Sequence, residues 1–195
     1  YQATGQQELA QTAEEVIEYV TRDLTSPDGA FYSAEDADSE GEEGKFYLWT
    51  VDEIRDVLGR EIAQAYCAVY NLEEEGNFRD EATGVRTGRN IPHLKGDLKE
   101  HAESLGVSVK ELTDTLEEAR LLLMKRREAR VRPSLDDKVL TDWNGLMVAA
   151  LARASTVVGK ERYLHTAQRA VDYLLETLVS PDGELLHRYR DGESA

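Results

Sequence analysis

NGLMVAALARASTVVGKERYLHTAQRAVDYLLETLVSPDG, residues 144–183, is the stretch that decides the fold. Its first part, residues 144–158, is apolar on nearly every side and rich in alanine, as expected of a helix surrounded by other helices. Gly159 and Lys160 follow, and the apolar residues of 161–178 then recur on one face only, at helical spacing. The stretch therefore predicts an αα-hairpin, in which an inner helix is joined by a short connection to an amphipathic outer helix.

The outer helix and its final turn occur twice in the chain. Residues 5–29, GQQELAQTAEEVIEYVTRDLTSPDG, align without a gap on residues 159–183 at an offset of 154, and nine of the 25 positions are identical, including SPDG. Proline cannot continue a helix and glycine accepts a positive φ, so SPDG predicts the same helix end in both copies. By this repeat we expect residues 1–4 to be the end of a further inner helix whose body would lie upstream.

Further helices are predicted between the two copies. Thr50 to Glu53 and Ser108 to Glu111 both fit the capping box, which predicts helices over 51–58 and 109–130. Residues 61–70 predict another short helix, and the glycine-containing stretch 73–96 predicts irregular chain. The basic end of the 109–130 helix suits the helix dipole and is expected to be structural.

Two short apolar runs, residues 30–32 and 46–49, flank an acidic loop. They predict a β-hairpin with a long tip. The expected fold is therefore mainly all-α, with a small β-hairpin insertion.

Composition excludes several classes of function. Of 195 residues, 39 are Asp or Glu and 23 are Lys or Arg, and the formal charge of −16 argues against nucleic acid or an anionic membrane as a partner. There is no apolar run long enough to span a membrane, and the first residues lack the pattern of a signal peptide, so a cytoplasmic location is expected. Cys67 is the single cysteine, which excludes an intramolecular disulfide, a CxxC redox pair and a zinc site made of cysteines.

The acidic loop partly fits a calcium-binding loop. Asp36, Asp38 and Glu40 fall at positions 1, 3 and 5 of the EF-hand pattern, and Gly41 falls at position 6. Position 12, which needs a bidentate glutamate, is Tyr47. We therefore expect a solvated or sugar-contacting loop and no specific calcium site.

A second polar constellation precedes the inner helix. Asp136-Asp137-Lys138 is followed by Asp142-Trp143-Asn144, and carboxylates, an amide and an indole beside a helical cluster are typical of a polyol-binding cleft. The alternative is structural, with Asp142 as a helix cap and an ion pair between Asp137 and Lys138.

The remaining polar patterns are weaker. The four histidines, at 93, 101, 165 and 187, have no metal-ligand spacing, so neither a metal nor a cofactor is expected. His187 follows the second SPDG, where it is a candidate for the rim of a cleft. The stretch VRTGRNIPHLK, residues 85–95, predicts either an anion site or a cover over the edge of a core.

Three strings carry a resemblance to a known family: GAFYSAEDADS (29–39), GKFYLWT (44–50) and DDKVLTDWNGLM (136–147). They closely resemble thioredoxin-domain-containing proteins of the YyaL and spermatogenesis-associated protein 20 type, and the resemblance covers nearly the whole chain. That family has an N-terminal thioredoxin-like domain followed by a helical domain similar to the (α/α)₆ toroids of N-acylglucosamine 2-epimerases and six-hairpin glycosidases. The resemblance implies that residues 1–195 are part of one such toroid, without the thioredoxin-like domain and the rest of the toroid.

Two functions follow as hypotheses. The first is a carbohydrate-active or carbohydrate-binding domain with glycosidase-like or epimerase-like chemistry in the full-length protein, whereas the isolated segment would be inactive. Its catalytic candidates are Asp36, Asp38 and Asp137, and its substrate-binding candidates are Tyr32, Glu35, Trp49, Lys138, Trp143, Asn144 and His187. The second is a non-catalytic module that presents client proteins to the thioredoxin-like domain of the same full-length chain. Because the inner helix would be incompletely covered, self-association of the segment is also expected.

Overall fold

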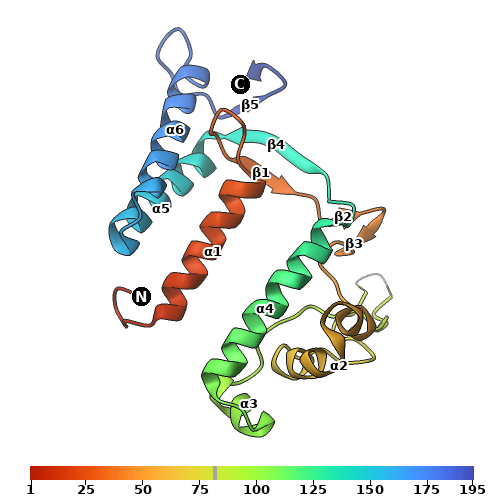
Figure 1. Cartoon of the computed structure of the whole chain (residues 1–195). Helices are drawn as coiled ribbons and strands as arrows, with labels where there is room; N and C mark the ends of the chain where they lie inside the picture. Colours follow the sequence, from red (N-terminus) through yellow and green to blue (C-terminus); the bar gives the residue numbers. More distant parts are fainter. Residues whose placement is uncertain (81–82) are drawn as a thin grey trace. The chain divides into compact units, whose positions relative to one another are not determined.

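The computed structural model describes residues 1–80 and 83–195 and divides them into two compact units. The first unit comprises residues 1–36 and 134–195, and the second comprises residues 37–133. The elements run in the order α1 (Gln7–Asp23), β1 (Tyr32–Glu35), β2 (Asp38–Ser39), β3 (Glu42–Glu43), α2 (Val51–Val69), α3 (Leu98–Leu105), α4 (Val109–Glu128), β4 (Leu135–Leu140), α5 (Thr141–Val158), α6 (Glu161–Thr177), β5 (Arg188–Arg190) and β6 (Glu193–Ser194) (Figure 1). The predicted fold class, mainly helical with a small β insertion, is confirmed. The toroid stays a prediction.

The repeat found in the sequence is also a repeat in structure. Helices α1 and α6 both end in an SPDG turn, and the chain then returns to the helix end through the same set of hydrogen bonds. The paired backbone bonds are Ser26 N–H to Ala30 O (2.8 Å) and Ser180 N–H to Glu184 O (2.8 Å), Gly29 N–H to Ser26 O (3.0 Å) and Gly183 N–H to Ser180 O (2.9 Å), and Tyr32 N–H to Leu24 O (2.9 Å) and Leu186 N–H to Leu178 O (2.8 Å). The turn after α1 therefore leads into β1, and the turn after α6 leads into β5.

These two strands flank β4 in one antiparallel sheet of order β1-β4-β5-β6. Tyr32 of β1 and Tyr189 of β5 both lie opposite Val139 of β4, so the three side chains share a face. That face packs on α6, where Leu174 and Leu178 complete a buried cluster.

The predicted pairing of residues 30–32 with 46–49 is wrong. Strand β1 pairs with β4, and the acidic loop instead contains its own two-residue strands, β2 and β3. Residues 46–49 stay in the second unit because Arg130 donates to the carbonyl oxygens of Phe46 (2.9 Å) and Leu48 (2.7 Å), with its guanidinium 4.0 Å from the ring centre of Trp49. Arg130, which follows α4 and belongs to the predicted basic cluster, therefore has a structural role.

The αα-hairpin predicted from residues 144–183 is confirmed. Helices α5 and α6 lie side by side and are joined at Gly159, whose φ of 76° ends α5 in the left-handed conformation (Figure 1). Leu151 of α5 packs with Tyr163, Ala167 and Ala170 of α6, and Ile17 of α1 joins this cluster. The hairpin therefore forms the centre of the first unit.

The second unit confirms both predicted capping boxes. The side chains of Thr50 and Ser108 each accept the backbone N–H three residues later, and the glutamate at that position bonds back. Helix α2 bends at Gly59, where φ is 73°, so it corresponds to the two helices predicted over 51–58 and 61–70. In the core of the second unit, α2 packs against the predicted apolar stripe of α4, which is made of Leu112, Leu116, Ala119 and Leu123.

Within the described residues, no helix combines the length and the apolar character needed to cross a membrane. The cytoplasmic location stays a prediction from the sequence.

Candidate functional site

Most of the charged residues singled out in the first unit gather at the sheet. A depression of about 410 Å³ lies against β1, β4 and β5, at the ends from which the acidic loop departs. It is lined by Ala34, Glu35, Asp36, Ser134, Leu135, Asp136, Lys138 and Arg190. The sheet topology therefore brings together residues that are about a hundred positions apart in the sequence.

Asp136 and Lys138 alternate with Asp137 along β4, so they point to the face opposite Asp137. Lys138 Nζ lies 3.1 Å from Asp136 Oδ2, and this hydrogen bond is the largest cause that holds the pKa of Asp136 below its ordinary value. Ser33 of the neighbouring strand donates to the backbone carbonyl of Asp136 (3.2 Å). Asp136 is thus kept ionised and well positioned.

Arg190 on β5 reaches both neighbouring carboxylates. Its Nε lies 3.0 Å from Asp137 Oδ1, and its Nη1 lies 4.0 Å from Asp136 Oδ1. These two carboxylate oxygens are shielded from solvent, yet among the residues that the structure describes neither has a donor in hydrogen-bond geometry. The contacts with Arg190 are therefore ion pairs that leave acceptor capacity unused.

Glu35, the last residue of β1, and Asp36, which follows it, lie on the other side of the depression. Tyr19 of α1 donates its hydroxyl to Glu35 Oε2 (2.8 Å), and the backbone N–H of Asp36 donates to Ser134 O (2.8 Å). Tyr19 therefore holds the carboxylate of Glu35, whereas Asp36 is held by its backbone, and the depression has carboxylates from Glu35, Asp36 and Asp136.

The chain matches curated proteins over most of its length. It is 31% identical to spermatogenesis-associated protein 20 of Homo sapiens over 191 residues, which is 89% of the chain and 24% of the human protein. The corresponding protein of Rattus norvegicus is 32% identical and that of Mus musculus 31% identical, each with the same coverage of both chains. The chain is homologous to part of spermatogenesis-associated protein 20. No family model matches it.

The family resemblance predicted from the sequence is thereby confirmed. The chain spans about a quarter of the length of spermatogenesis-associated protein 20 in these species.

In this homologue of spermatogenesis-associated protein 20, Tyr32 lies outside the depression. It faces the core with Val139, and burial raises the pKa of its hydroxyl, with the negative charge of Asp137 as the second cause. Asp137, on the same face, is near Tyr32 and is held by Arg190, so it does not line the depression.

Asn144 is a buried residue whose carboxamide is fully engaged. Its Oδ1 accepts the N–H of Phe31 (2.7 Å), and its Nδ2 donates to the carbonyls of Phe31 (2.8 Å) and Leu140 (2.9 Å). This side chain joins the start of α5 to the chain entering β1. We therefore assign Asn144 a structural role and do not include it in the candidate site.

Trp143 and His187 lie at the start of α5, outside the depression. Trp143 is exposed, and His187 Nδ1 is 4.0 Å from Asp142 Oδ1, with both side chains largely exposed. Asp142 is not the N-cap of α5, because Leu140 occupies that position. The structure brings His187 and Asp142 near each other without enclosing them.

Two predicted site residues belong to the second unit. Asp38 lies on β2, and Trp49 is buried in the core, where its backbone pairs with that of Asn90 (2.7 and 3.0 Å). Among the described residues, no group of three or more His, Cys, Asp or Glu side chains is placed to hold a metal ion.

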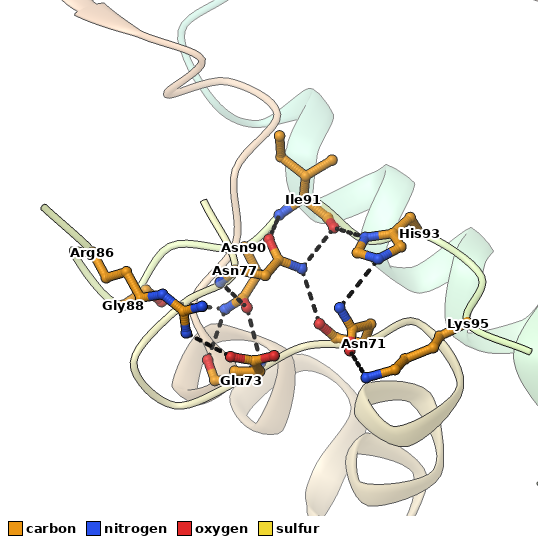
Figure 2. A network of polar contacts seen from close by, with 9 residues as sticks. All are labelled: Asn71, Glu73, Asn77, Arg86, Gly88, Asn90, Ile91, His93 and Lys95. Atoms are coloured by element: carbon orange, nitrogen blue, oxygen red, sulfur yellow. Dashed lines mark hydrogen bonds and ion pairs between the residues drawn. The ribbon is translucent and has the colours of Figure 1, made fainter. Parts of the chain in front are cut away.

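The 85–95 stretch covers the edge of the second core through a network of amides (Figure 2). The buried carboxamide of Asn90 accepts the N–H groups of Glu73 (2.8 Å) and Asn77 (3.0 Å) and donates to three backbone carbonyls. Arg86 pairs with Glu73 (2.7 Å). Because its amides and this arginine are engaged within the chain, the network favours the structural interpretation of the stretch over an anion site.

Sequence reasoning included Glu35, Asp36 and Lys138 but missed Arg190 as a site residue. A signal for Arg190 was present, because β5 follows the second SPDG as β1 follows the first. Extending the repeat beyond Gly183 would have pointed to residues 188–190 as a partner strand.

Proposed function

We propose that the depression on the sheet of the first unit binds a saccharide or another small polyol. The observation that carries the proposal is the lining itself, in which three carboxylates and two cations surround one depression. A volume of about 410 Å³ falls within the range typical of small-molecule sites.

The mixture of charges indicates the class of ligand. Carboxylates accept hydrogen bonds from hydroxyl groups, and lysine and arginine donate to the oxygens of the same groups. Because three negative groups face two positive ones, the lining gives no strong preference for a highly charged ligand. A neutral molecule with many hydroxyl groups can use both kinds of partner.

Binding is better supported than catalysis. A general acid for glycoside cleavage needs a raised pKa, so that it carries a proton near neutral pH. The pKa of Asp136 is instead lowered by Lys138. None of the described residues that line the depression is aromatic, and Trp143 is not among them.

The proposal is tested by titrating a panel of mono- and disaccharides while following backbone amide resonances. We expect one class of saccharide to shift the resonances of residues 34–36, 134–138 and 190 in a saturable way. Arg190→Ala should weaken this binding by about tenfold or more, because it removes a charged hydrogen-bond donor.

Arg188→Ala is the matched control. Arg188 lies on the same strand and is exposed, but it does not line the depression. If no saccharide shifts these resonances, or if Arg188→Ala weakens binding as much as Arg190→Ala, the proposal fails.

A second candidate, the protein-binding module of a full-length protein, is favoured by one specific observation. Trp143 and Leu146 are exposed on α5, the most apolar helix of the first unit, and large exposed apolar groups are typical of protein contacts. Leu146→Glu should abolish binding of a client protein while leaving saccharide binding unchanged. The opposite pattern would remove this candidate.

A further inference from the structure

A second depression of the first unit, of about 440 Å³, lies beside α6. Tyr189 of β5 lines it, whereas the next residue, Arg190, lines the proposed saccharide site, because successive residues of a strand point to opposite faces of the sheet. The two depressions are therefore separate. The other charged or aromatic residues of this lining are Asp28, Arg169, Asp172, Tyr173 and Glu176.

The first SPDG turn forms one wall of this depression. Arg169 of α6 donates from Nη2 to the carbonyl oxygen of Pro27 (2.9 Å), so the turn is fixed against α6. Asp28, the next residue of the turn, is thereby held beside Asp172 and Glu176. These two carboxylates are four residues apart on α6 and are therefore neighbours on its surface.

Two tyrosine rings supply the aromatic part of the lining. The ring of Tyr173 on α6 packs edge to face with that of Tyr189, and their centroids are 6.1 Å apart. Both side chains are only partly buried, so ring surface is accessible from the depression. Aromatic rings attract organic cations through their negative faces, and they also offer apolar contact to a hydrocarbon chain.

The charges of the lining are unbalanced. Its described residues include three carboxylates and one cation, Arg169, which donates to a backbone carbonyl. None of the three carboxylates forms an ion pair with a residue that the structure describes. At the proposed saccharide site, by contrast, Asp136 is paired with Lys138 (3.1 Å). The second depression therefore favours a positively charged ligand, whereas the first does not.

We propose that this depression binds a small organic cation with two or more amino groups, of the linear polyamine type. Its ammonium groups pair with Asp28, Asp172 and Glu176, and the hydrocarbon between them lies against the tyrosine rings. An extended cation fits better than a metal ion, because among the described residues no three His, Cys, Asp or Glu side chains are placed to hold one. This site is independent of the proposed saccharide site.

The test is a titration with spermidine, a linear triamine, followed through backbone amide resonances. We expect saturable shifts at residues 28, 172–177 and 189, and weaker binding at high salt. Asp28→Asn should weaken binding about threefold, since an exposed ion pair contributes little, and the double variant with Glu176→Gln should weaken it about tenfold. Tyr189→Leu, with its melting temperature measured alongside, should also weaken binding about threefold through loss of the aromatic contact.

The repeat provides the matched control. Asp182 is the equivalent of Asp28 in the second SPDG turn and is likewise exposed, but it does not line the depression. Asp182→Asn removes the same charge and should leave spermidine binding unchanged.

Three results would overturn the proposal. The first is equal weakening by Asp28→Asn and Asp182→Asn, or shifts that spread over the acidic surface without saturation. The second is unchanged binding in a folded Tyr189→Leu variant. The third is the same saturable shifts with magnesium chloride at equal concentration, or binding of a lysine-rich peptide but not of spermidine, because either would assign the depression to another class of ligand.

Discussion

Replacing Asn144 with alanine is expected to destabilise the first unit severely. The Asn144 carboxamide holds two backbone groups of Phe31, and all of these groups are buried. Alanine cannot replace either bond. The third bond matters less, because Leu140 O lies four residues before Asn144 and can still accept the backbone N–H of α5.

The magnitude follows from the groups left without partners. A buried donor or acceptor that loses its partner costs about 1 to 3 kcal/mol. Two such groups, the N–H and the C=O of Phe31, predict a loss of about 3 kcal/mol in the free energy of unfolding. For a chain of this length that loss lowers the melting temperature by about 10 °C.

The assay is urea unfolding combined with hydrogen exchange at the amide of Phe31. We expect Asn144→Ala to lower the unfolding free energy and to speed exchange at Phe31 well before global unfolding. Gln168→Ala, which removes an exposed carboxamide from α6, should change stability by no more than about 0.5 kcal/mol. If Asn144→Ala is as mild as this control and Phe31 stays protected, the structural role of Asn144 is refuted.

Three further predictions concern single positions. Gly29→Ala should destabilise the chain more than Gly183→Ala, because both glycines have positive φ but only at Gly29 would a new Cβ meet a neighbour, Arg169 Cβ at 3.0 Å; thermal melting of the pair checks this. Ser108→Ala should cost about 1 kcal/mol through loss of its cap, measured by urea unfolding. The pKa of Asp136 is lower in the folded chain than in the unfolded chain, so ionised Asp136 makes a small stabilising contribution. This contribution is present above the unfolded pKa of about 3.9 and is lost as pH falls through the folded pKa. The free energy of unfolding, measured from pH 6 to 2, should therefore depend less on pH in Asp136→Asn.

The helices were predictable because their determinants are local. Apolar periodicity, capping boxes at Thr50 and Ser108, and the SPDG turns each depend on a few neighbouring residues, and the structure confirms all three. The bend at Gly59 was implied by the gap between the predicted helices. Local preferences of this kind agree with the final fold, so they can be predicted without knowing the tertiary packing.

The strand pairing was not predictable by the same means. Residues 135–140, LDDKVL, contain three consecutive charged residues and no apolar alternation, so nothing local marks β4 as the centre of a sheet. Its pairing with β1 joins residues about a hundred positions apart, and such partners are chosen by packing. The predicted hairpin failed because Arg130 binds the carbonyls of Phe46 and Leu48.

The candidate site shows how a repeat can build an asymmetric surface. Strands β1 and β5 follow equivalent turns and flank the same strand, but β1 ends at Glu35 and is followed by Asp36, whereas β5 supplies Arg190. Two equivalent backbones therefore bring opposite charges to the two sides of Asp136. A repeat alone predicts where these side chains lie but not their charge, since only the backbone turn is shared. The mixed charge, which is the basis for proposing a neutral polyol as ligand, arises from the positions at which the two copies differ.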